Sequence, residues 1–157
     1  MPPPGEYERF QIDTLLRLQP RNIETGAALV LLPIGEKFDD LYRVSIAPAL
    51  AMTGLNRAEV RRVFDHQSPL ADVAETLQTA EVIVADMTYL NPAIMYVLGL
   101  AHGLGRSPIL IAREFNDLPF NLRALRCIEY TPRGWGLVKL REHLMRAVRI
   151  FISASRQ

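Results

Sequence analysis

The sequence contains a single cysteine, Cys127, in 157 residues. A lone cysteine excludes an intramolecular disulfide and any metal site built from several cysteines, and we expect it to be a small buried residue. No apolar run approaches the roughly 20 residues that a membrane-spanning helix needs. The first ten residues, MPPPGEYERF, lack the apolar stretch of a signal peptide. We therefore expect a cytoplasmic protein with no membrane partner.

An excess of charge of one sign is also missing. Lysine and arginine number 18 against 17 aspartates and glutamates, which leaves a net charge of +1. This balance provides no attraction for a nucleic-acid polymer or an anionic lipid, and we expect neither as a partner. Hydrophobic residues make up 49% of the chain and charged residues 22%, as in ordinary globular proteins. The length fits one domain.

Several catalytic motifs are absent from the chain. It has no G-x-G-x-x-G, no P-loop, no G-x-S-x-G and no histidine pair at metal-binding spacing. Hydride transfer, phosphoryl transfer and serine-nucleophile chemistry therefore lack their usual signs. No cofactor and no metal are expected.

What the chain does contain is an alternation of apolar runs and amphipathic segments. The continuous apolar run at 27–33 suits a strand that is covered on both faces, and EVIVAD (81–86) is the clearest strand of the chain. Weaker strands are expected at 59–64, 108–113 and 126–130, and helices at 39–53, 68–79, 92–104 and 136–153. Pro48 weakens the continuity of the first helix. The alternation predicts a single α/β domain over 26–157, with a five-stranded, mostly parallel sheet between helices.

Residues 1–25 are expected to form an N-terminal extension with a short amphipathic helix over 6–18. In the domain that follows, ligands should bind beyond the carboxyl ends of the strands. Three segments should meet there: 33–40, 86–91 and the residues after Ala112. Functional residues are therefore sought in these loops.

Asp86 is the last residue of a buried strand and should point into this cleft. Its carboxylate could accept hydrogen bonds from the hydroxyls of a ligand, or it could order its own loop through Thr88. Gly35 would allow close approach of the backbone, and Phe38 could either stack on a base or belong to the core.

Asn91 has the features of a helix N-cap, and the helix that it begins would offer free backbone N–H groups to a phosphate or carboxylate. Gly99 and Gly103 are spaced to permit close approach between this helix and the sheet. His102 lies among small residues, where a packed role is favoured over a catalytic one.

Three stretches of the chain resemble a known family. They are VLLPIGEKFDDLY (30–42), AEVIVADMTYLNPAIMYVLGLAHGLGRSPILIA (80–112) and DLPFNLRALRCIEY (117–130). Together they resemble the nucleoside 2-deoxyribosyltransferase-like proteins of bacteria, which are flavodoxin-like domains related in architecture to TIR domains. The resemblance covers about 29–130. It implies a flavodoxin-like three-layer sandwich, a cleft for a nucleoside or nucleotide, and a homodimer.

The resemblance also suggests individual residues. Asp86 matches the acid that holds the sugar, and Asn91, Tyr96, Gly99 and His102 match other motif positions. The candidate ligand contacts are therefore Gly35, Phe38, Asp86, Thr88, Asn91, Tyr96, Gly99 and His102.

The chain departs from the family pattern at Val97, where active members carry a glutamate that attacks the anomeric carbon of the sugar. Glycosyl transfer through a covalent intermediate needs a carboxylate, which an isopropyl group cannot supply. No catalytic residue is therefore assigned. The sequence therefore predicts a nucleoside- or nucleotide-binding domain with impaired catalysis, an argument that requires position 97 to face the cleft.

Two alternatives remain open. One is an active N-glycosidase or deoxyribosyltransferase, acting on a nucleoside or NAD through another acid such as Glu36, Glu114 or Asp117. The other is a protein-interaction module without a small ligand.

Overall fold

The computed structural model describes residues 18–19, 21–62, 70–114, 118–119, 122 and 125–156, with the backbone alone for 70–72. The helix expected over 6–18 lies almost wholly outside these residues. The first strand begins at Glu24, two residues before the expected start of the domain.

The strands form one sheet in which every described neighbour pair is parallel. Their order in the sheet is β2-β1-β3-β4-β5, the flavodoxin-like order. This confirms the predicted fold class. The strands are β1 (Glu24–Leu32), β2 (Arg57–Arg62), β3 (Ala80–Asp86), β4 (Ile109–Ala112) and β5 (Cys127–Glu129).

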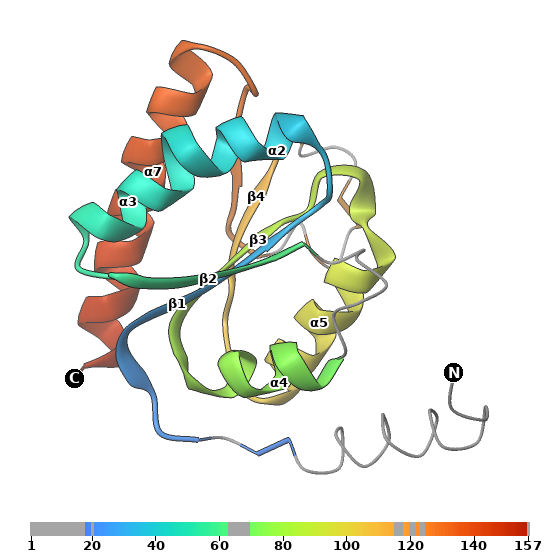
Figure 1. Ribbon diagram of the computed structural model, residues 1–157, viewed down its shortest axis with the longest axis vertical. Coiled ribbons are helices and arrows are strands. Elements are labelled where there is room, and N and C mark those ends of the chain that lie inside the picture. The colour runs from blue at the N-terminus through green and yellow to red at the C-terminus, as the bar shows by residue number, and fades with distance from the viewer. Residues whose placement is uncertain are drawn as a thin grey trace.

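Helices cover both faces of the sheet (Figure 1). One face packs against α2 (Glu36–Leu41), the π-helical turn η1 (Tyr42–Ile46), α3 (Ala47–Met52) and α7 (Trp135–Ser155). The other packs against α4 (Leu70–Thr79) and α5 (Pro92–Gly103). Each face has its own cluster of buried hydrophobic residues. Among the described helices, none combines the length and the apolarity that crossing a membrane requires.

The helix predicted over 39–53 is divided into three segments. It begins at Glu36, and η1 separates α2 from α3. The division places Pro48 in the first turn of α3, where its missing N–H is tolerated. In the middle of a continuous α-helix, the same residue would remove one hydrogen bond and clash with the preceding turn.

The second strand was predicted two residues too late. β2 spans Arg57–Arg62 instead of 59–64, and residues 63 and 64 lie outside the described part of the chain. Its side chains are exposed or half-buried, because β2 is an edge strand. It therefore lacks the continuous apolar run that marks β1 and β3.

Cys127, expected to be buried, is half-buried at the start of β5. Burial, reinforced by the negative charges of Asp86 and Glu129, raises the pKa of its thiol to about 12. The thiol therefore stays protonated and unreactive at neutral pH.

The predicted close approach at Gly99 and Gly103 is wrong. Both glycines are exposed, and a Cβ atom on either would meet no heavy atom within 4 Å. Replacing Gly99 with alanine should therefore raise the free energy of unfolding by about 0.5–1 kcal/mol, because it lowers the entropy of the unfolded chain. Urea denaturation measures the change. As a contrast, Gly136→Ala should destabilise the protein, since its Cβ would overlap the backbone of Thr131. A destabilising Gly99→Ala would restore a packing role for Gly99.

Candidate functional site

The three predicted loops converge at the carboxyl edge of the sheet, around the side chain of Tyr89. From the first turn of α2, which follows β1, Lys37 Nζ donates a hydrogen bond to Tyr89 Oη at 2.9 Å and lies 4.5 Å from the ring centroid. From the end of β4, Arg113 Nη1 donates to the same oxygen at 3.4 Å. The ring of Phe38 meets that of Tyr89 edge to face, with 6.5 Å between centroids. The expected meeting of the loops is confirmed.

Tyr89 is held in an unusual backbone conformation. It lies in the short 3₁₀ turn η2 (Thr88–Leu90), with φ 66°, and Leu90 follows with φ 48°. Two consecutive non-glycine residues with positive φ are costly, and such strain tends to gather at functional sites. The result is a ring that is 65% exposed although it is held by three neighbours. The strain makes this turn the first place to look for function.

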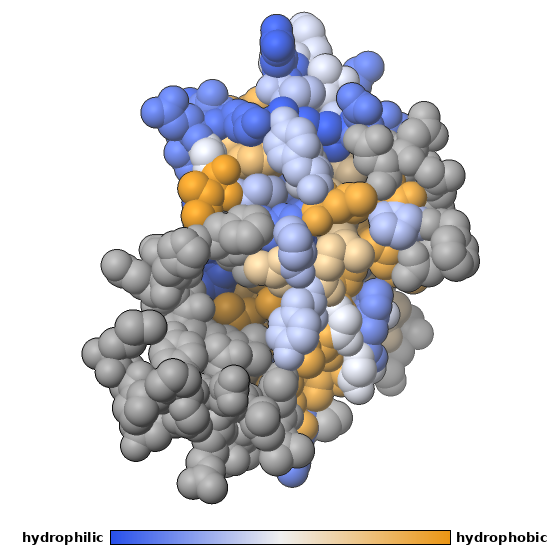
Figure 2. Space-filling view, turned by 90° about the vertical axis from the view of Figure 1, so that its right-hand side faces the viewer, coloured by the Kyte–Doolittle hydropathy of each residue, from blue (hydrophilic) through white to orange (hydrophobic). Residues whose placement is uncertain are grey.

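A hollow of about 350 Å³ lies beside Tyr89, between the ends of β3, β4 and β5. This volume is at the lower end of the range for small-molecule sites. The face shown in Figure 2 gathers hydrophilic side chains at its upper end, with hydrophobic ones among them lower down. The hollow is lined by Met87, Thr88, Tyr89, Arg113, Glu114, Tyr130, Thr131 and Pro132.

Asp86 lies behind this hollow and is fully buried. Its Oδ1 accepts a hydrogen bond from the Thr88 amide at 2.8 Å, and its Oδ2 accepts one from the Tyr130 hydroxyl at 2.6 Å. Thr88 Oγ1 in turn accepts from the amide of Arg113 at 3.2 Å. These contacts tie the end of β3 to the ends of β4 and β5. They support the second role expected for Asp86, in which it orders its own loop through Thr88. Contact of Asp86 with a ligand stays a prediction.

Burial dominates the electrostatics of this network. It raises the pKa of Asp86 above its usual value, although hydrogen bonds from Thr88 and Tyr130 oppose the change. Burial also raises the pKa of Tyr130, and the charge of Asp86 adds to this effect. Tyr130 is therefore a neutral donor at physiological pH, and it is one of the residues that line the hollow.

Asn91 caps α5 as predicted, but the helix start is not free for an anion. Asn91 Oδ1 accepts from the amides of Ala93 at 2.9 Å and Ile94 at 3.3 Å. Pro92 has no N–H, and the Met95 amide is bonded to the backbone oxygen of Asn91. The cap therefore uses the donors that a phosphate would need. The predicted anion site at this helix start is wrong.

Val97 does not face the hollow. Its side chain is 3% exposed and belongs to the core cluster under α5, together with Ile94, Leu98 and Ala101. None of the described residues that line the hollow comes from α5. Position 97 is thus a core position in this chain, contrary to the expectation that it lies at the cleft.

The other predicted contacts are dispersed. Thr88 lines the hollow, and Gly35 lies at the start of α2 with φ 138°, which favours glycine. Phe38 is only 1% exposed, so its core role is the one that the packing supports. On α5, Tyr96, Gly99 and His102 are exposed and away from the hollow.

Four residues of the site were not singled out from the sequence: Lys37, Tyr89, Arg113 and Tyr130. Lys37 and Tyr89 lie within loops that were expected to line the cleft. Arg113 was assigned to the fourth strand, but β4 ends at Ala112, so Arg113 belongs to the loop that follows. Tyr130 follows β5, and its position next to Asp86 depends on the order of the strands.

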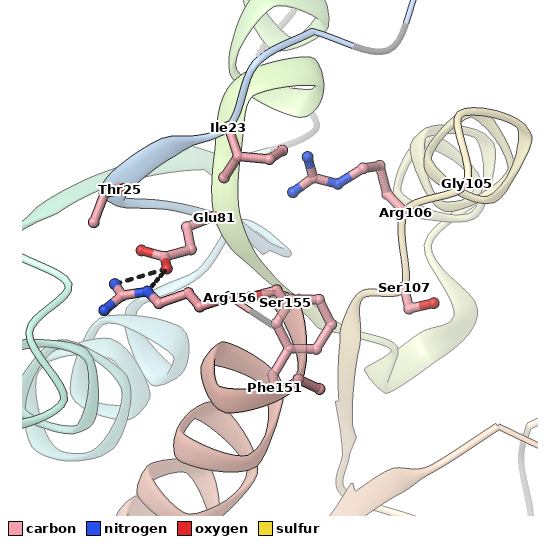
Figure 3. A pocket seen from close by; sticks show the side chains of 10 residues that line it. Ile23, Thr25, Glu81, Gly105, Arg106, Ser107, Phe151, Ser155 and Arg156 are labelled. Carbon is pink, nitrogen blue, oxygen red and sulfur yellow. Dashed lines mark hydrogen bonds and ion pairs between the residues drawn. The ribbon is translucent and has the colours of Figure 1, made fainter.

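A larger hollow, of about 480 Å³, opens at the opposite, amino edge of the sheet (Figure 3). There Glu81, only 3% exposed, accepts from the Gly26 amide at 2.7 Å and pairs with Arg156 at 2.8 Å. Arg106 donates to the backbone oxygens of Gln78 and Ala80. The charged groups of this hollow are thus held by the protein itself. The pair between Arg156 and Glu81 ties the end of α7 to the sheet, and Arg106 ties the segment after α5 to the start of β3.

The described residues contain no group of three or more histidine, cysteine, aspartate or glutamate side chains placed to hold a metal ion. Neither a scan against protein-family models nor a search of curated proteins found a match to the chain.

Proposed function

We infer that this chain is a nucleoside- or nucleotide-binding domain of the nucleoside 2-deoxyribosyltransferase-like class, and that its glycosidic chemistry is impaired. The observation that carries the proposal is the hollow at the carboxyl edge, where the loops after β3, β4 and β5 meet. In open α/β sheets, ligands bind at this edge. The resemblance of the sequence supplies the class of ligand.

The lining of the hollow suits such a ligand. Thr131 and Glu114 have side chains that can form hydrogen bonds with a sugar, while Met87 and Pro132 add apolar groups to the lining. The absence of a carboxylate at Val97 is no longer an argument about the hollow, because Val97 is buried in the core. Impaired catalysis is supported instead by the described lining of the hollow, in which Glu114 is the only carboxylate, whereas glycosidic chemistry generally uses a pair.

Isothermal titration tests binding with the four common deoxynucleosides and their 5′-monophosphates. We expect a dissociation constant in the micromolar range for at least one of them. Thr131→Trp should weaken binding at least tenfold, because the indole would fill the hollow, whereas Ser153→Trp near the exposed end of α7 should not. Binding that survives Thr131→Trp unchanged would place the ligand elsewhere. If no compound binds, the proposed function fails.

Impaired catalysis is measured in the same samples as release of the free base, or of nicotinamide from NAD. We expect no turnover near typical enzyme rates. Such turnover, if it were abolished by Asp86→Asn, would show that the site is catalytically competent.

One observation favours a second candidate, an active N-glycosidase. Glu114 is exposed and lines the hollow, so its carboxylate could replace the missing glutamate. Glu36 is exposed at the start of α2, and Asp117 lies outside the described residues. A glycosyl adduct detected by mass spectrometry and lost in Glu114→Gln would establish this mechanism. Base release that Glu114→Gln leaves unchanged would remove Glu114 from it.

A further inference from the structure

We propose that Tyr89 holds the place of a ligand phosphate, and that a nucleotide binds by displacing its phenol and bridging Lys37 and Arg113. The inference rests on the proposed function and narrows the ligand from nucleosides to their phosphates. Of Tyr89, Lys37 and Arg113, Tyr89 is the only residue whose removal should strengthen nucleotide binding.

The position of Tyr89 is the first support. The order β2-β1-β3-β4-β5 reverses direction between β1 and β3, which makes the ends of these two strands the usual ligand crevice of the fold. Tyr89 follows β3 and contacts Lys37 and Phe38, which follow β1. Its ring therefore lies at the part of the sheet edge where this fold usually binds its ligand.

The contacts of the phenol oxygen are the second support. Tyr89 Oη accepts hydrogen bonds from two cations, Lys37 and Arg113, which approach from different loops. Two converging cations are an arrangement suited to a phosphate, which has several acceptor oxygens and a full negative charge. The hydrogen bond from Lys37, with the positive charge of Arg113, also lowers the pKa of the Tyr89 phenol. Negative charge is thus favoured at the point that this oxygen occupies.

Among the described residues, neither cation has a carboxylate partner. Lys37 and Arg113 take part in none of the ion pairs of this part of the chain. The Nε atom of Arg113 is buried without a hydrogen-bond partner. The cations instead lie over aromatic rings, with the Arg113 guanidinium 5.3 Å from the Phe38 centroid. A phosphate would give both of them a charged partner.

The strained turn supplies a reason for displacement. Tyr89 and Leu90 both have positive φ, which side chains other than glycine adopt at a cost. Because the ring is 65% exposed, it can leave its neighbours without opening the core. A displacement in which the turn also changes its backbone conformation releases this strain, and it exposes the cations.

Titrations of the full chain with deoxynucleosides and their 5′-monophosphates test the proposal. The monophosphates should bind about tenfold or more tightly than the nucleosides, the effect of a charge-assisted hydrogen bond, and added salt should weaken only their binding. Tyr89→Gly should strengthen monophosphate binding about tenfold, because the competing phenol is gone and glycine accepts the left-handed backbone. Tyr89→Phe, which lacks only the oxygen, should strengthen it less.

Lys37→Met should weaken monophosphate binding about tenfold and leave nucleoside binding unchanged. The matched control is Lys139→Met, an exposed lysine on α7 that should change neither. If monophosphates bind no better than nucleosides, the proposed phosphate site at Lys37 and Arg113 is wrong, while the proposed nucleoside-binding function is unaffected. If Tyr89→Gly weakens monophosphate binding, Tyr89 is a ligand contact and the displacement idea is wrong. If neither class binds, the proposed function fails and this inference fails with it.

Discussion

Replacing Val97 with glutamate is expected to destabilise the protein by about 3–5 kcal/mol and to create no glycosidic activity. The side chain of Val97 is 3% exposed and lies in the apolar cluster between α5 and the sheet. A carboxylate there must either stay neutral, with a raised pKa, or force its way out of the core. The family resemblance alone would predict the opposite result for Val97→Glu, a gain of glycosidic activity. Measuring the stability and the activity of this variant therefore distinguishes the two expectations.

The neighbouring residue gives a matched control. Tyr96 is 52% exposed on the same helix, so Tyr96→Glu adds the same charge without burying it. We expect its effect on stability to stay within about 0.5 kcal/mol. Chemical denaturation near pH 7 and near pH 4 compares the two variants. The destabilisation of Val97→Glu should shrink at the lower pH, where a protonated carboxyl is easier to bury. A stable Val97→Glu protein that releases free base would instead place position 97 at the cleft.

The burial of Val97 could have been predicted from the sequence. Ile94, Val97, Leu98 and Ala101 recur at helical spacing, the pattern of a helix face that packs against a core. In the structure, these four are the buried hydrophobic residues of α5. Family resemblance placed position 97 at the cleft, whereas periodicity would have placed it in the core. For this helix, the local pattern was the better guide.

The sheet was predictable for a related reason. The apolar run at 27–33 overlaps β1 and the segment 81–86 lies within β3, two of the three strands that have a neighbour on both sides. A strand that is buried on both faces is apolar at nearly every position, and this pattern can be recognised without knowing its neighbours in the fold. The edge strand β2 and the divided helix have no such pattern, and their boundaries were predicted wrongly.

The cluster around Tyr89 could not be predicted. Rules for turns assign positive φ to glycine and, less often, to asparagine or aspartate, and residues 89 and 90 are neither. The direction of the Tyr89 ring follows from that backbone conformation, and its contacts with Lys37 and Arg113 follow from the direction of the ring. Sequence reasoning could name the loops that meet, but not the side chains that touch.

Removal of the Asp86 carboxylate should have the second large effect. In Asp86→Ala, the Thr88 amide and the Tyr130 hydroxyl lose their acceptor inside the protein. Each buried donor left without a partner costs about 1–3 kcal/mol, so we expect a loss of about 2–6 kcal/mol for the two of them. Because the same network joins the ends of β3, β4 and β5, the hollow should lose its shape as well. Ligand affinity should fall together with stability.

The conservative change Asp86→Asn tests the electrostatics of this network. Burial raises the pKa of Asp86 in the folded state above its usual value of 3.8. The protonated carboxyl therefore contributes stability that is fully present below pH 3.8 and is lost as the pH rises through the folded-state pKa. Asparagine is neutral throughout, so the stability advantage of the native protein over Asp86→Asn should shrink across that window. Urea denaturation at several pH values measures it, with Asp40→Asn as an exposed control whose effect should stay small. An advantage that grows with pH would mean that the two hydrogen bonds outweigh burial and that Asp86 is held in the folded protein as a carboxylate.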